Sequence, residues 1–212
     1  MNTFNTNTNT LHRYIKFPFE MEMPKEFDQQ FDDNKVIEIK SGSIDSRFDQ
    51  WISQFDLNYA TLLEGFYTAP LNKLPIHSDI VTKNTSRFTF SNITKLNFTW
   101  GSDHSTTRWW IPTDPQLVEK FQQDSKNPNM QLTPNVTDEN DPPHVFLDEN
   151  QCEMIFEKVI NRPSILNVGQ LHSTYNPANT PRWTLSVMLL KKDGTCVNFD
   201  EALQIFKDVI DE

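Results

Sequence analysis

Four side chains of this sequence could do chemistry together: His77 and Asp79, separated by one residue, and His172 and Arg182, much further along the chain. Two imidazoles and one carboxylate are the ligand set that holds non-haem Fe(II) on one face and leaves the opposite positions open. An arginine shortly after the second histidine could bind the carboxylate of an organic co-substrate. The pattern therefore predicts a metal site with His77, Asp79 and His172 as ligands.

The spacing of these residues suits ligands that are carried on strands. In extended backbone, residues i and i+2 project to the same side, so His77 and Asp79 can face one ion while Ser78 points away. His172 lies in a second strand-like segment, 164–175. Because a β-barrel brings such distant segments together, we expect the site inside a β-rich body.

A strand at 183–190 presents Arg182 in an unusual setting. Alternation places Arg182, Thr184 and Ser186 on one face. The other face is apolar and reads as ordinary core: Trp183, Leu185, Val187 and Leu189. A guanidinium followed by two hydroxyls packs poorly but suits a carboxylate, and a buried arginine without an anion would be costly. An inward-pointing Arg182 would therefore indicate an anionic ligand.

The elements that must position these residues are mostly short strands. Runs rich in Phe, Trp, Ile, Val and Thr, separated by Pro, Asn and Asp, predict strands at 35–40, 62–67, 93–100, 106–111, 152–160, 164–168 and 183–190. Helices are predicted at 45–57, capped by Ser43 or Asp45, and at 200–210, capped by Asp200. Many short strands with turn signals imply a sandwich or barrel. We therefore expect a mainly β fold with flanking α-helices.

Three segments stand apart from this β-rich domain of residues 34–199. Residues 1–33 are expected to be an N-terminal extension whose first ten residues are disordered. Residues 113–150 are rich in proline and acid and are expected to be either a lid over the site or an inert insertion. Residues 200–212 are expected to form a C-terminal helix packed on the core.

The composition narrows the class of protein. The 212 residues suffice for one domain, and the formal net charge of −10 argues against nucleic acid as a partner. Cys152 and Cys196 fit no zinc-finger spacing and are expected to be reduced thiols. The first residues lack the apolar stretch of a signal peptide, and no window approaches the ~20 apolar residues of a membrane span. These features predict a soluble cytoplasmic protein with no membrane partner.

The motif order resembles that of 2-oxoglutarate/Fe(II)-dependent dioxygenases of the double-stranded β-helix (jelly-roll, cupin-like) class. That class has H-x-D/E, then a distal His, then Arg or Lys. Within it, the block from His172 to Arg182, with Asn176 four residues after the histidine, is similar to the aspartyl/asparaginyl β-hydroxylase-like group. Two departures are Asp79, where part of that group lacks a carboxylate, and Asn97, where the group tends to have a histidine.

The resemblance implies a cofactor, a co-substrate and a role for each residue. Fe(II) would be held by His77, Asp79 and His172, which are thereby the catalytic residues, and 2-oxoglutarate would bind with O2. The residues implied for 2-oxoglutarate are Arg182, Thr184, Ser186 and Asn97. Asp79 favours hydroxylation over halogenation, with release of succinate and CO2. The primary substrate, a protein or peptide side chain or a small molecule, is not identified by the sequence.

Two other classes of protein compete with this hypothesis. One is a non-catalytic cupin-like binding or structural protein in which the histidines are structural. The other is a zinc hydrolase with a His/Asp/His site, although neither histidine has a glutamate beside it as a general base. His104 could be an active-site residue or a solvated loop residue, and His144 could sit on the lid. One of Trp109 and Trp110 is expected in the core and the other at the pocket wall.

Overall fold

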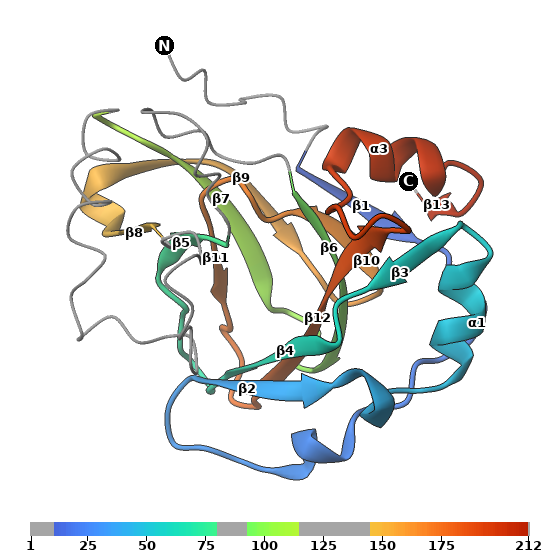
Figure 1. Ribbon diagram of the computed structural model, residues 1–212. Helices are drawn as coiled ribbons and strands as arrows, with labels where there is room; N and C mark the ends of the chain where they lie inside the picture. The colour runs from blue at the N-terminus through green and yellow to red at the C-terminus, as the bar shows by residue number, and fades with distance from the viewer. Residues whose placement is uncertain (1–10, 80–92, 115–144, 212) are drawn as a thin grey trace, which may run out of the picture.

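Two antiparallel β-sheets face each other, and two helices cover the outer side of the larger sheet (Figure 1). The computed structural model describes residues 11–79, 93–114 and 145–211. The larger sheet contains β1 (His12–Ile15), β2 (Lys35–Lys40), β3 (Leu57–Tyr59), β4 (Leu62–Thr68), β6 (Thr94–Gly101), β10 (Ser164–Asn167), β12 (Arg182–Lys191) and β13 (Ile210–Asp211). The smaller sheet contains β5 (Ile76–Ser78), β7 (Thr106–Pro112), β8 (Val145–Leu147), β9 (Cys152–Val159) and β11 (His172–Tyr175). The α-helices are α1 (Arg47–Ser53) and α3 (Phe199–Ile205), and short 3-10 helices span Lys25–Asp28, Ser41–Ser43 and Glu149–Gln151.

The strand order interleaves segments that are far apart in the chain. The larger sheet runs β13-β1-β10-β6-β12-β4-β2, with β3 also paired to β12, and the smaller runs β8-β5-β11-β7-β9. The two sheets are tied together at several points, for example where the Trp109 indole donates to the Asn167 carbonyl at 3.2 Å. The expectation of a mainly β fold with flanking helices is confirmed.

The outer face of the larger sheet carries the main apolar core. Side chains at alternate positions of β4, β6 and β12 pack there against α1 and α3. Phe48, Trp51 and Ile52 of α1 are buried in this core. Trp51 stacks on Phe206 at the end of α3 with ring centroids 5.6 Å apart, so the two helices share one packed layer.

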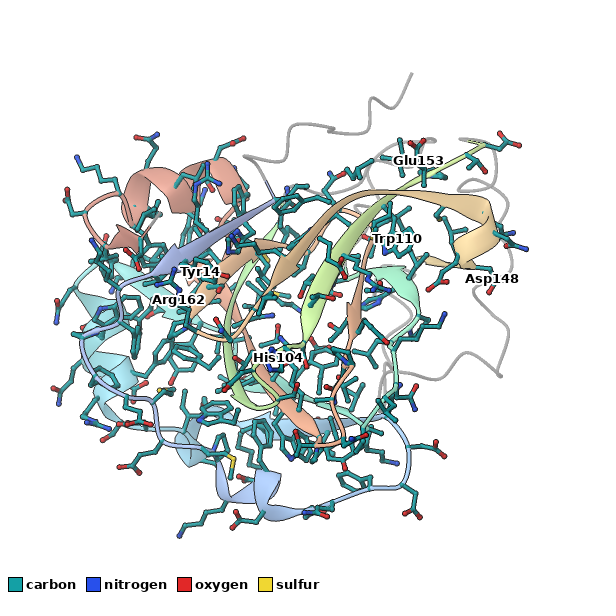
Figure 2. The ribbon with its side chains drawn as sticks, turned by 180° about the vertical axis from the view of Figure 1, so that it is seen from behind. Tyr14, His104, Trp110, Asp148, Glu153 and Arg162 are labelled. Atoms are coloured by element: carbon teal, nitrogen blue, oxygen red, sulfur yellow. The ribbon has the colours of Figure 1, made fainter. Side chains whose placement is uncertain are left out.

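Residues 11–33 belong to the folded domain, which corrects the expectation that residues 1–33 form an extension. The strand β1 lies between β10 and β13 in the larger sheet. Phe27 stacks on Trp183 with centroids 4.2 Å apart, and a Cβ at Gly65 would approach Phe27 to 2.5 Å. The segment lacks a sequence period because only four of its residues are in a strand while its aromatic residues fill gaps in the outer core. The Arg162 guanidinium carbon lies 3.9 Å from the centroid of the Tyr14 ring, a cation–π contact between β1 and the segment before β10 (both residues are labelled in Figure 2).

Both predicted helices are shorter than expected. Residues 45–57 were expected to be helical, but α1 begins at Arg47, whose backbone N–H donates to the Asp45 carboxylate, and it ends at Ser53. The C-terminal helix is capped by Asn198 instead of Asp200, because Asn198 and Glu201 form a reciprocal capping box. The chain then leaves the helix, and Ile210 joins β13 beside β1.

The expected lid lies largely outside the described residues, as do residues 1–10 and His144. The end of that segment is described: β8 pairs with β5, and Phe146 is the register partner of His77. Neither α-helix in the described ranges has the length and apolar sequence to cross a bilayer.

Candidate metal centre

The three predicted metal ligands come together on two neighbouring strands of the smaller sheet. His77 lies in β5 and His172 opens β11, and the two histidines are direct register partners. Asp79 follows β5 immediately and is held by its backbone N–H, which donates to the Val168 carbonyl at 3.1 Å. Cross-strand partners share a face, so both imidazoles point into the space between the sheets.

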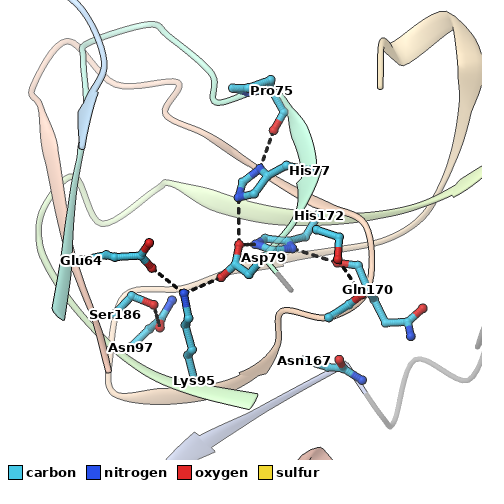
Figure 3. Close-up of polar contacts among 12 residues, drawn as sticks. Glu64, Pro75, His77, Asp79, Lys95, Asn97, Asn167, Gln170, His172 and Ser186 are labelled. Carbon is cyan, nitrogen blue, oxygen red and sulfur yellow. Dashed lines mark hydrogen bonds and ion pairs between the residues drawn. The ribbon is translucent and has the colours of Figure 1, made fainter. Parts of the chain in front are cut away.

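The ligand atoms converge on one point (Figure 3). Oδ1 of Asp79 is 3.2 Å from Nε2 of His77 and 3.6 Å from Nε2 of His172. One ligand atom from each residue lies within 4.8 Å of the others, so His77, Asp79 and His172 form a group that could hold a metal ion. Two nitrogens and one oxygen on one side leave the cavity side open for further ligands, which fits the donor chemistry of a divalent transition metal.

Each histidine is oriented by a backbone carbonyl two residues earlier. Nδ1 of His77 is 2.8 Å from the Pro75 oxygen, and Nδ1 of His172 is 2.9 Å from the Gln170 oxygen. A carbonyl can only accept, so each Nδ1 carries a proton, which leaves each Nε2 as the atom that can bind a metal ion. The same local geometry on two strands thus prepares both imidazoles as ligands.

A buried lysine that the sequence analysis did not identify completes the surroundings of Asp79. Lys95, on β6 of the larger sheet, places its ammonium 2.8 Å from Oδ2 of Asp79 and 2.5 Å from a carboxylate oxygen of Glu64 (Figure 3). Asp79 therefore directs one oxygen to the histidines and the other to Lys95. The lysine is almost fully buried, whereas Glu64 is about one-third exposed.

The electrostatics of Asp79 and His172 favour metal binding at neutral pH. Burial alone would raise the pKa of the Asp79 carboxyl, but Lys95 and His77 outweigh burial and hold this pKa well below its usual value. Burial, together with the neighbouring His77, lowers the pKa of His172 to about 4. For His77, burial is outweighed by Asp79, which raises the pKa. Asp79 is thus ionised and His172 neutral, the forms in which these side chains bind metals.

A cavity between the two sheets opens in front of the ligands. Its lining includes His77, Asp79 and His172 from one side and Arg182, Thr184, Ser186 and Asn97 from the other. The remaining lining residues are Phe66, Leu74, Thr107, Leu166, Val168 and Thr174. Every residue that the sequence assigned to the metal or the co-substrate therefore lines the same cavity.

Arg182 is the most unusual of the cavity residues. Its side chain is 98 % buried, since only 2 % of its surface remains exposed, yet it forms no ion pair with any carboxylate of the described residues. Among the described residues its side chain makes one hydrogen bond, a 3.4 Å contact to the Ile160 carbonyl, and its Nε has no partner there. Burial lowers its pKa to about 10, so it remains a cation. The expectation that Arg182, Thr184 and Ser186 share one face is confirmed, and this face lines the cavity.

The other residues singled out in the sequence have structural positions. Asn176 is fully buried and ties its loop to the carbonyls of Thr68, Ala69 and Thr180. His104 is exposed in the turn between β6 and β7 (Figure 2). Trp109 belongs to a second, smaller apolar core that also contains Ile160 and Leu166. Trp110 is also buried, with its indole donating to the Ser173 hydroxyl. Neither tryptophan is among the cavity-lining residues, so the expectation that one would wall the pocket is wrong.

The two cysteines are free thiols, as expected, and neither belongs to the ligand group.

No protein-family model matches the sequence, and a search of curated proteins finds no significant match. A function is therefore inferred from the chemistry of the site alone.

Proposed function

We propose that the protein is an Fe(II)- and 2-oxoglutarate-dependent oxygenase that hydroxylates a protein side chain or a small molecule. One observation carries this proposal. The His77, Asp79 and His172 ligand group shares a cavity with Arg182, a buried cation that has no anionic partner among the described residues. A metal site and an anion site on one cavity fit a ligand that binds at both ends.

The ligand group supports iron over the metals of the competing hypotheses. A zinc hydrolase would also use three protein ligands, but it needs a general base, and no glutamate stands next to His77 or His172 in the sequence. Two histidines and one carboxylate with open positions are typical of non-haem Fe(II) oxygenases. Fe(II) bound here with 2-oxoglutarate would supply the oxidising chemistry, in which O2 is consumed and succinate and CO2 are released.

The charges around the cavity support a doubly negative co-substrate. The charged side chains here are Asp79 and Glu64, which are negative, and Lys95 and Arg182, which are positive. They balance one another, so a divalent ion would leave an excess of two positive charges in a largely buried site. Uncompensated buried charge is costly. A dicarboxylate such as 2-oxoglutarate would restore neutrality.

The strand pairing supports a jelly-roll, or double-stranded β-helix, fold. The strands β4, β5, β6, β7, β9, β10, β11 and β12, taken in chain order, pair first with eighth, second with seventh, third with sixth and fourth with fifth. Such nested pairing belongs to one long antiparallel hairpin. Its strands are distributed over two facing sheets, as in a rolled-up hairpin.

Within this proposal each inner residue has a defined task. Arg182 would form a charge-assisted pair with the distal carboxylate of 2-oxoglutarate, with the hydroxyl of Thr184 or Ser186 beside it. Ser186 donates to Asn97 at 2.9 Å, which leaves the Asn97 amide N–H groups for the other end of the co-substrate. Leu166, Val168 and Phe66 line the cavity with apolar surface and limit the access of water.

The first experiment tests the metal and the co-substrate together. The purified protein is loaded anaerobically with Fe(II), and 2-oxoglutarate is added while the visible metal-to-ligand charge-transfer band is recorded. The wild type is expected to give the band and His172→Ala to lose it. A wild type that binds Fe(II) but gives no band would contradict the oxygenase and favour a non-catalytic metal-binding protein.

The second experiment separates the co-substrate from the metal. Arg182→Ala is expected to weaken 2-oxoglutarate binding by about 10- to 100-fold, because a hydrogen bond to a charged group contributes roughly 1.5–3 kcal/mol. Its Fe(II) affinity should stay at the wild-type value. Arg108→Ala is the matched control, since Arg108 is paired with Glu157 on the outside of the smaller sheet. Loss of metal binding in Arg182→Ala would identify Arg182 as structural.

A further inference from the structure

Lys95 occupies a position in which a lysine needs a special reason. It lies in the middle of the larger sheet, with Leu166 and Met188 as register partners on either side. Only 3 % of its surface is exposed. A buried ammonium is costly unless it is paired, and replacement of such a pair by apolar residues is often neutral or stabilising. The fold alone therefore gives no reason for a lysine here.

The contact that Lys95 makes is selective for one oxygen of the metal carboxylate. Its ammonium is 2.8 Å from Oδ2 of Asp79, whereas Oδ1 faces Nε2 of His77 at 3.2 Å. The two oxygens of Asp79 are thus assigned to different partners. An ion that sits between the imidazoles meets Oδ1, while Oδ2 is already held by a charge-assisted hydrogen bond.

We propose that Lys95 is a positioning residue of the metal centre, which holds Oδ2 of Asp79 so that the carboxylate binds the ion through Oδ1 alone. A carboxylate that binds through both oxygens takes one of the coordination positions that a co-substrate or O2 needs. By restricting Asp79 to one oxygen, Lys95 keeps that position open. The inference rests on the metal site of the proposed function, although not on the identity of the co-substrate.

Glu64 makes a cation so close to the metal acceptable. The ammonium of Lys95 lies between the carboxylates of Glu64 and Asp79, at 2.5 and 2.8 Å. Without Glu64, the positive charge of Lys95 would cancel the negative charge of Asp79, and the site would lose its attraction for the incoming ion. With Glu64 present, Lys95 can fix the geometry of Asp79 while the group of three keeps one net negative charge for the metal.

The coordination mode of Asp79 tests the proposal with Mn(II) alone, which needs neither turnover nor 2-oxoglutarate. Crystal structures of the Mn(II)-loaded wild type, Lys95→Met and Lys95→Arg are compared. In the wild type and Lys95→Arg, one Asp79 oxygen is expected on the metal and the other on residue 95. In Lys95→Met, both oxygens are expected to move onto the metal, with the loss of one open position.

Two controls separate coordination from stability. Lys191→Met removes the lysine of another Lys–Glu pair, Lys191 with Glu201, at the surface, and should leave the Asp79 geometry unchanged. Glu64→Gln keeps Lys95 on Oδ2 and should keep the one-oxygen mode while it weakens Mn(II) binding. If Lys95→Met does not fold, the wild type still decides: carboxylate infrared bands from Mn(II)-loaded minus metal-free protein should show the wide splitting of one-oxygen coordination.

The outcomes distinguish this inference from the proposed function. A wild type in which Asp79 binds Mn(II) through both oxygens, or in which Lys95 leaves Oδ2 when the metal enters, overturns the role of Lys95 and leaves the oxygenase proposal intact. One-oxygen binding in Lys95→Met does the same. A wild type that binds no divalent metal overturns the metal centre and, with it, the inference.

Discussion

The two faces of the larger sheet are built from alternate residues of the same strands, yet they have opposite characters. The outer face is apolar and packs against α1 and α3. The inner face lies toward the smaller sheet. It carries the ion pair of Glu64 and Lys95, and its residues Asn97, Arg182, Thr184 and Ser186 line the cavity. We infer that the outer face mainly stabilises the fold and that the inner face carries the residues of the proposed reaction. Neighbouring residues of one strand should therefore respond to substitution in different ways.

The largest effect on stability is expected on the outer face. Leu185 is fully buried in the main core, between two inward-facing hydroxyl residues of β12. Leu185→Ala should lower the free energy of unfolding by about 2–5 kcal/mol, because a buried leucine leaves a cavity that the structure fills only in part. Urea denaturation measures this loss. The folded fraction should bind Mn(II) as the wild type does, and a weaker Mn(II) affinity would show that the two faces are not independent.

The dependence of stability on acidic pH should reveal the buried, neutral His12 of the inner face. His12 is the register partner of Leu166, and burial followed by the charges of Lys158, Arg13 and Arg162 lowers its pKa to about 3. An unfolded histidine has a pKa near 6.5. Between pH 6.5 and 3 the unfolded chain therefore takes up a proton that the folded protein excludes, so stability is full above pH 6.5 and falls as the pH drops through this window.

Comparison with His12→Phe isolates this contribution. From pH 6.5 to 4.5 the wild type should lose about 2–3 kcal/mol of unfolding free energy relative to the variant. His172 titrates in both proteins, so its contribution cancels in the difference. A difference that does not vary with pH would mean that His12 gains a partner for its proton on folding.

Arg182→Met is expected to raise the stability of the ligand-free protein, whereas Leu185→Ala lowers it. In the ligand-free protein the variant should be more stable by about 1–3 kcal/mol, because an uncompensated buried cation is replaced by an apolar side chain of similar length. Thermal unfolding should show a higher Tm for the variant. With Mn(II) and 2-oxoglutarate the order should reverse, since only the wild type has a partner for the second carboxylate. A destabilised ligand-free variant would indicate that Arg182 is held by contacts that support the fold.

The sequence predicted the two faces of β12 because both sets of residues are distinctive. Arg182, Thr184 and Ser186 alternate with four large apolar residues, and such a pattern has one solution on a strand. The histidine ligands were equally readable from type and spacing. What made them one site, the register of His77 with His172, comes from pairing between segments about a hundred residues apart.

Lys95 was missed for a physical reason. On β6 it alternates with Leu96, and a lysine that alternates with apolar residues ordinarily faces solvent. Only the second sheet, which covers this face, turns a surface position into a buried one. The strand β1 was missed because four residues with long-range partners carry too little local signal. The cap of α3 was misplaced because Asn198 and Asp200 are both good capping residues, and the capping box with Glu201 selects Asn198.

The smallest effect separates the two faces at neighbouring positions. The Ser186 hydroxyl donates to Asn97 at 2.9 Å across β12 and β6. Ser186→Ala should cost about 1 kcal/mol, the net contribution of one buried hydrogen bond, as measured by urea denaturation. Because the cavity beside Ser186 leaves no tightly packed neighbours to lose, the cost should stay well below that of Leu185→Ala one position away. A loss as large as that of Leu185→Ala would mean that the inner face is packed as tightly as the outer one, with no room for a co-substrate.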